Sequence, residues 1–207
     1  MQNKTNQNGR SMIEMLGVLA VIGVLTVGGF SLVGKVSTSH RANTLVDEVG
    51  ALANRTRTIF HEFVIDKTSE NQVDTDMNQY ICEARAYPES LEPTLSDNKC
   101  AAGSFTDKDD AKFDVIRYRD TTTKIDYYYI KVSQLDKDLC MALSQSSWGS
   151  PSINGFLGIC VGTCTDGGIV GTTNGTYIAT NGAKMALDDS VMACSSDTDN
   201  AVFLTFR

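Results

Sequence analysis

The sequence contains little histidine, proline or tryptophan: two, three and one of these residues, respectively, among 207. The two histidines, His40 and His61, are too few for an imidazole-based zinc site or a histidine-based catalytic centre. The chain also lacks the Gly-x-Ser-x-Gly, His-Glu-x-x-His and phosphate-loop motifs of common enzyme classes. We therefore expect no enzymatic activity, no bound metal ion and no cofactor.

Acidic residues outnumber basic ones. The sequence has 25 aspartates and glutamates against 18 lysines and arginines, which gives a formal net charge of −7. An acidic chain of this kind argues against nucleic acid as a partner. With 42% hydrophobic and 21% charged residues, the sequence is neither disordered nor collagen-like. Its length predicts one domain with an appendage.

Charged residues are also missing from residues 15–33, a run of nineteen that follows a polar stretch at residues 1–9. At about 1.5 Å per helical residue the run reaches roughly 28 Å, close to the ~30 Å hydrocarbon core of a bilayer. It is longer than the apolar region of an ordinary secretory signal and contains no Ala-x-Ala cleavage site. We therefore expect a transmembrane helix.

Glu14 stands directly before this run. A carboxylate on an apolar helix costs roughly 2.5 kcal/mol or more at membrane depth, and such a cost usually marks a partner or a function. Alternatively, Glu14 lies in the headgroup layer and favours the positive end of the helix dipole. Considered alone, the residue is compatible with both interpretations.

The residues Gly9-Arg10-Ser11-Met12-Ile13-Glu14, followed by Met-Leu-Gly-Val-Leu-Ala-Val-Ile-Gly, resemble the start of type IV prepilins and related secretion pseudopilins. The resemblance covers about the first 35 residues. It implies cleavage after Gly9, a new and often N-methylated terminus at Arg10, and an assembly role for Glu14. Arginine departs from the phenylalanine, methionine or leucine that the family usually carries at the first mature position.

By this resemblance, residues 1–9 are a leader peptide, residues 10–36 are a transmembrane and assembly helix, and residues 37–207 are a periplasmic or extracellular domain. The implied function is a structural subunit of a surface filament for adhesion, aggregation or conjugation. Its partners would be further copies of the chain, a prepilin peptidase, the pilus assembly machinery and, during biogenesis, the inner membrane with the N-terminus cytoplasmic. The alternatives are a type II secretion pseudopilin, a minor pilin and a membrane-anchored extracytoplasmic binding protein.

The helical pattern continues after the apolar run, because no proline occurs before Pro88. Apolar positions recur at spacings of three and four. They are Leu45, Val49, Leu52, Thr56, Ile59, Phe60 and Phe63, and the polar residues between them are Arg41, Asp47, Glu48, Asn54, Arg55 and Arg57. One helix from residue 11 to residue 63 would be roughly 80 Å long.

The remaining sequence alternates between turn-rich and strand-like segments. The aromatic run Tyr127-Tyr128-Tyr129 could form a sugar-binding surface, but one of these residues should face the core of an antiparallel sheet. Ser133 and Asp136 form a capping-box pattern before a short helix. The predicted elements are an irregular segment at 66–110, strands at 113–118 and 124–132, a helix through 143, loops and short strands at 149–182, a helix at 184–193 and a strand at 201–206.

Six cysteines, an even number, are typical of an exported, disulfide-bonded protein, and they allow fifteen complete pairings. Cys82 and Cys100 bracket part of the irregular segment, and we expect them to pair and staple it. Cys160 and Cys164 can close a tight local loop, with a redox or metal site as the alternative. Acidic clusters at 107–110 and 197–199 could in principle bind calcium, although neither has an EF-hand pattern.

Residues 140–149 and 194–206 are similar in spacing and composition to the terminal region of type IVb pilins. This resemblance implies a disulfide between Cys140 and Cys194. It also implies an α+β fold in which a long N-terminal helix, half transmembrane and half amphipathic, packs on an antiparallel sheet with a disulfide-bounded C-terminal region.

Overall fold

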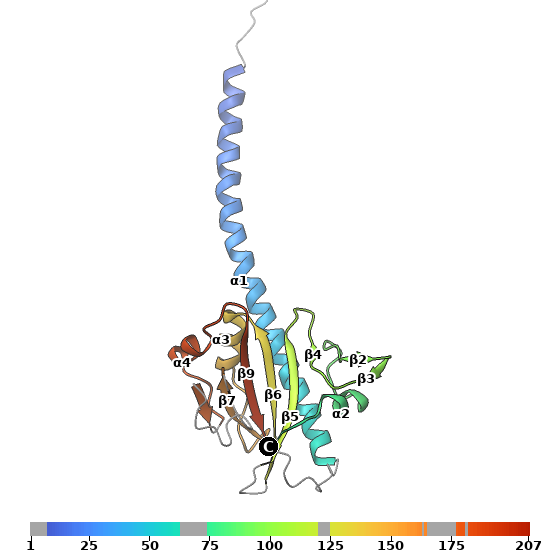
Figure 1. Ribbon diagram of the computed structural model, residues 1–207. Helices are drawn as coiled ribbons and strands as arrows, with labels where there is room; N and C mark the ends of the chain where they lie inside the picture. The colour runs from blue at the N-terminus through green and yellow to red at the C-terminus, as the bar shows by residue number, and fades with distance from the viewer. Residues whose placement is uncertain (1–7, 63–73, 120–124, 163, 165–176, 181) are drawn as a thin grey trace, which may run out of the picture. The chain divides into compact units, whose positions relative to one another are not determined.

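The computed structural model describes residues 8–62, 74–119, 125–162, 164, 177–180 and 182–207. Within these, the side chains of 8–13, 24–36, 61–62, 74–75 and 177–178 are outside the description. The chain divides into two compact units, Met1–Arg41 and Ala42–Arg207. The fold is α+β, and its first element is helix α1, Asn8–Glu62 (Figure 1).

The prediction of a transmembrane half in this helix is wrong for the residues that the structure describes. No helix, taken over its described residues, is long and apolar enough to cross a bilayer. The transmembrane segment expected at residues 10–36 is therefore not supported over its described residues.

In the described part of the second unit, seven strands form one antiparallel sheet in the order β1-β5-β6-β9-β7-β8, with β4 also pairing with β5. A separate hairpin joins β2 and β3. The strands are β1 (Asp74–Asp76), β2 (Leu95–Ser96), β3 (Lys99–Cys100), β4 (Phe105–Thr106), β5 (Lys112–Arg119), β6 (Asp126–Leu135), β7 (Phe156–Val161), β8 (Tyr177–Thr180) and β9 (Asn200–Phe206). The short helices are α2 (Asn78–Glu83), α3 (Lys137–Gln145) and α4 (Leu187–Ala193).

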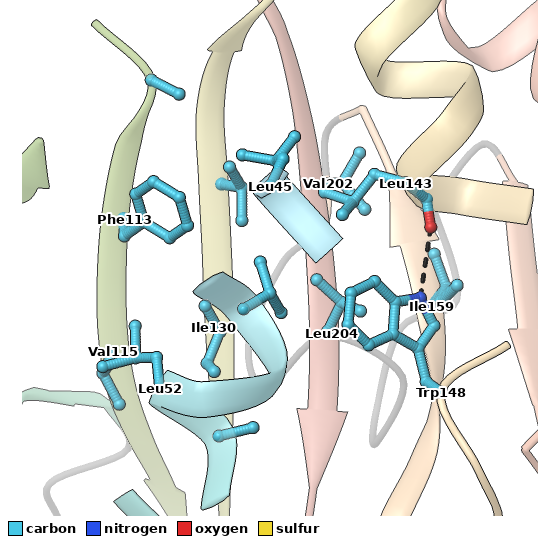
Figure 2. Close-up of a cluster of buried hydrophobic side chains, with 14 of the residues drawn as sticks. Leu45, Leu52, Phe113, Val115, Ile130, Leu143, Trp148, Ile159, Val202 and Leu204 are labelled. Carbon is cyan, nitrogen blue, oxygen red and sulfur yellow. Dashed lines mark hydrogen bonds between the residues drawn. The ribbon is translucent and has the colours of Figure 1, made fainter. Parts of the chain in front are cut away.

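The core lies between α1 and one face of this sheet (Figure 2). Leu45, Val49 and Leu52 follow the helical repeat and are at most 2% exposed. They pack against alternate strand residues, because successive side chains of a strand point to opposite faces. These include Val115, Ile130, Val202 and Leu204. The apolar periodicity of residues 45–60 therefore positions the helix on the sheet.

The three tyrosines of β6 divide between the two faces. Tyr128 joins the core cluster, whereas Tyr127 and Tyr129 pack with Phe203 in a second cluster. The Tyr128 hydroxyl donates to the Ala53 carbonyl oxygen at 3.0 Å, and its burial raises the pKa of the phenol well above the ordinary value. All three rings are at most 9% exposed, which makes packing their structural role.

The helix after β6 begins at a different cap from the predicted one. Asp136 is the N-cap of α3, and its carboxylate accepts from the Leu139 backbone N–H at 2.8 Å. Ser133 remains in β6, because the strand continues through an irregular register between Val132 and Leu135. Pairing of Ser133 with Lys112 of β5 thus overrides the local capping pattern.

Gly155 is needed where the last strand meets the loop before β7. It has a φ of +75°, its carbonyl oxygen accepts from the Arg207 backbone N–H at 2.9 Å, and a Cβ there would collide with the Arg207 carbonyl oxygen. We expect Gly155→Ala to lower the free energy of unfolding by more than about 1 kcal/mol, measured by urea denaturation.

Gly50 is the matched control for this substitution. It lies within α1, and a Cβ there would meet nothing within 4 Å. Gly50→Ala should therefore stabilise the protein by about 0.8–1 kcal/mol through helix propensity. Equal destabilisation by both substitutions would contradict the collision at Gly155.

Candidate functional site

The sequence places its main candidate site at the start of α1. Gly9 and Arg10 belong to this helix, but their side chains lie outside the described residues. Glu14 is described and is exposed. Among the described residues, no cation pairs with the Glu14 carboxylate. The proposed cleavage site between Gly9 and Arg10 is not tested by the structure.

Large apolar side chains follow Glu14 on all sides of the helix. Because an α-helix turns by about 100° per residue, positions 15–22 cover its whole circumference. Each large side chain here is between 52% and 66% exposed: Met15, Leu16, Val18, Leu19, Val21 and Ile22. Burying one such side chain yields about 1.5–3 kcal/mol. A surface of this kind marks an interaction site, and an apolar circumference calls for partners on several sides.

Gly17 lies within this apolar surface, and Gly23 directly follows it. A Cβ at either position would meet nothing within 4 Å. Small residues let two helices approach closely when they meet. Among the described residues, therefore, no neighbouring group requires glycine at these positions, and close packing would have to come from another molecule.

The structure joins the cysteines in three disulfides: Cys82 to Cys100, Cys140 to Cys194, and Cys160 to Cys164. All six cysteines are described, and none is free. The second of these links α3 to the residue that ends α4. A free thiol for redox or metal chemistry at Cys160 and Cys164 is thus absent from this arrangement.

The two acidic clusters do not form a metal centre in the part of the chain that the structure describes, where no group of three potential ligands was found. Asp107 instead closes a turn, because its Oδ1 accepts from the backbone N–H groups of Asp109 and Ala111 at 2.9 and 2.8 Å. Asp197 and Asp199 are exposed on the loop before β9.

Of the two histidines, His40 is exposed on α1, and the side chain of His61 lies outside the description.

Glu48 is the charged residue whose placement the sequence does not predict. It is only 4% exposed, and neither carboxylate oxygen meets a partner at hydrogen-bonding geometry among the described residues. Burial raises the pKa of this carboxyl group above its ordinary value of 4.5. Asp107 and Asp109 add to the increase in pKa, whereas the Ser90 hydroxyl and Lys108 oppose it.

This environment predicts a pH-dependent gain from Glu48→Gln. Since the folded-state pKa lies above the unfolded value, stability is lost as the pH rises from the unfolded to the folded pKa, and the loss is complete above it. The variant should therefore melt at a higher temperature than the wild type at pH 7, with the difference shrinking below about pH 4. Calorimetry at both pH values measures this, with exposed Glu89→Gln as the control; an equal gain at both pH values would refute an ionisation cost.

Comparison with models of protein families gives no match, and no curated protein sequence matches it significantly. The functional argument consequently depends on the residues and geometry given above.

Proposed function

We propose that the chain is a non-enzymatic structural subunit of an extracellular filament of the type IV pilin kind, assembled through the N-terminal part of α1. The observation that carries this proposal is the exposed apolar circumference at residues 15–22, directly after Glu14. Copies of the same helix are the occupant that fits, because a bundle surrounds each member with apolar partners on several sides.

Glu14 sets the register of this bundle in our proposal. A carboxylate carried among packed apolar helices would be buried, and an isolated buried ion costs several kcal/mol. Cleavage after Gly9 by a prepilin peptidase creates an α-amino group at Arg10, which supplies the opposite charge from a neighbouring subunit. Only those alignments of neighbouring helices that place this amine beside the Glu14 carboxylate pair the two charges.

The second unit supports an extracytoplasmic location in the same proposal. Its three disulfides suit an oxidising compartment, since thiols in the cytoplasm are normally kept reduced. Removal of residues 1–9 takes away Lys4 and changes the formal charge from −7 to −8. The filament surface would therefore be acidic and unsuited to binding DNA through bulk electrostatics.

The test uses the full chain expressed together with a prepilin peptidase and a pilus assembly system. We expect intact-mass analysis to find a chain that begins at Arg10 and electron microscopy to show filaments. Cells that express the chain without the peptidase are the control and should contain the uncleaved form without filaments. Filaments built from chains that retain Met1 would overturn the proposal, as would cleaved chains that never assemble.

A further inference from the structure

A polar hollow of about 540 Å³ lies on the sheet face opposite α1. Its floor comes from β5 and β6, which lie side by side (Figure 1). Lys112 is in register with Ser133, and Asp114 with Lys131. These residues alternate with the core residues of both strands and so point away from the helix. The volume is within the range of about 300–1,000 Å³ that is usual for small-molecule sites.

Several polar side chains in this hollow have no hydrogen-bond or ion-pair partner within the described chain. Five of them make no hydrogen bond or ion pair there: Lys112, Ser133, Gln134, Ser195 and Asp199. Asp114 accepts from the Asn78 amide at 3.2 Å and, although it lies opposite Lys131, forms no ion pair with it. The Lys131 ammonium lies 5.9 Å from the centroid of the Phe203 ring. The hollow thus presents donors and acceptors that are available to a ligand.

The wall formed by the loop before β9 is fixed in place. Asn200 is only 6% exposed, and its amide donates to the carbonyl oxygens of Leu135 and Ser196 at 3.0 and 2.6 Å. It also accepts from the Ser196 backbone N–H at 3.1 Å. On the other side, Gln134 adopts a φ of +62°, a conformation that a non-glycine residue holds only when its surroundings enforce it. The backbone of the hollow is therefore held in place at these two positions without a ligand.

The chemistry of the lining selects the ligand class. Two lysines and two aspartates balance one another, which favours neither an anion nor a cation. The same lining carries the hydroxyl groups of Ser133 and Ser195 and the amide of Gln134, which supply both donors and acceptors. A polyhydroxylated, uncharged molecule matches this pattern, because each of its hydroxyl groups both donates and accepts. We propose that this hollow is a saccharide-binding site, independent of whether the chain forms filaments.

The experiment titrates the full chain with glucose, galactose, mannose and N-acetylglucosamine and follows binding by saturation-transfer NMR and calorimetry. At least one of these sugars should bind. Asp199→Ala and Lys112→Met should each weaken that binding about tenfold or more, because each removes a charged hydrogen-bonding group. Asp189→Ala and Lys184→Met are matched controls, since both residues are exposed and lie outside the hollow.

Three results would overturn this assignment. One is the absence of binding by all four sugars at millimolar concentration. Another is binding that Asp199→Ala and Lys112→Met leave unchanged. The third is tighter binding of glycine or inorganic phosphate than of any sugar, which would identify a zwitterion or anion site. Near-ultraviolet circular dichroism should be unaltered in the variants, because the substituted side chains make no hydrogen bond or ion pair with the described residues.

Discussion

Glu14→Ala is expected to reduce filament yield to less than about a tenth of the wild-type level while leaving the unit Ala42–Arg207 folded. In the proposed bundle, the variant would leave the α-amino group of Arg10 without its counter-charge among apolar helices. A buried, unpaired ammonium costs several kcal/mol, and that cost recurs at every subunit. The measurement is the mass of sheared filaments per cell, compared at equal subunit expression.

Further substitutions separate charge from shape at this position. Glu14→Gln keeps the size but removes the charge and should fail like alanine, whereas Glu14→Asp keeps the charge and should retain part of the assembly. Glu89→Ala, at an exposed glutamate of the second unit, should assemble normally. Filaments at wild-type yield from Glu14→Ala would show that no ion pair sets the register.

Replacing both Cys140 and Cys194 by alanine should lower the free energy of unfolding by about 4 kcal/mol, according to the chain-entropy model for a closed loop of 54 positions. That is a large share of the 5–15 kcal/mol typical of a folded domain. Both cysteines are fully buried, so alanine avoids leaving a serine hydroxyl without a partner. Urea denaturation followed by the fluorescence of Trp148, which packs at the end of α3, measures the change.

The other two disulfides supply internal controls. Loops of 18 and 4 positions predict smaller losses, about 3 kcal/mol for the Cys82–Cys100 pair and about 2 kcal/mol for the Cys160–Cys164 pair. One contact between α3 and α4 persists without the large loop, since the Ser144 and Ser190 hydroxyls lie 2.6 Å apart. If the three double variants showed the reverse order of stability, loop closure would not be the main contribution.

Local sequence patterns predicted the positions of the regular elements well. The strands expected at 113–118 and 124–132 correspond to β5 and β6, and the strand at 201–206 corresponds to β9. These predictions succeed because a half-buried antiparallel strand alternates apolar and polar residues. The helix expected at 184–193 begins later, at Leu187, because the backbone of its N-cap residue Ala186 is extended, with a ψ of 152°.

The same patterns failed where a residue's environment comes from distant segments. Glu48 has the sequence context of an exposed helical residue, yet Ser90 and the turn around Asp107 surround it. Ser133 has the context of a helix cap, yet it pairs with Lys112 in the sheet. In both cases the partner lies more than twenty positions away, beyond the reach of a local pattern.

The sequence by itself determined the helical repeat of α1, the alternation of the central strands and the apolar run after Glu14, because each of these depends on residues that are close neighbours in the chain. The tertiary structure alone decided which faces are buried, that the Glu48 carboxylate lies in the interior, and that Lys112 and Asp199 line one hollow. Burial and shared cavities arise from contacts between segments far apart in sequence, and their geometry follows only once the sheet has assembled.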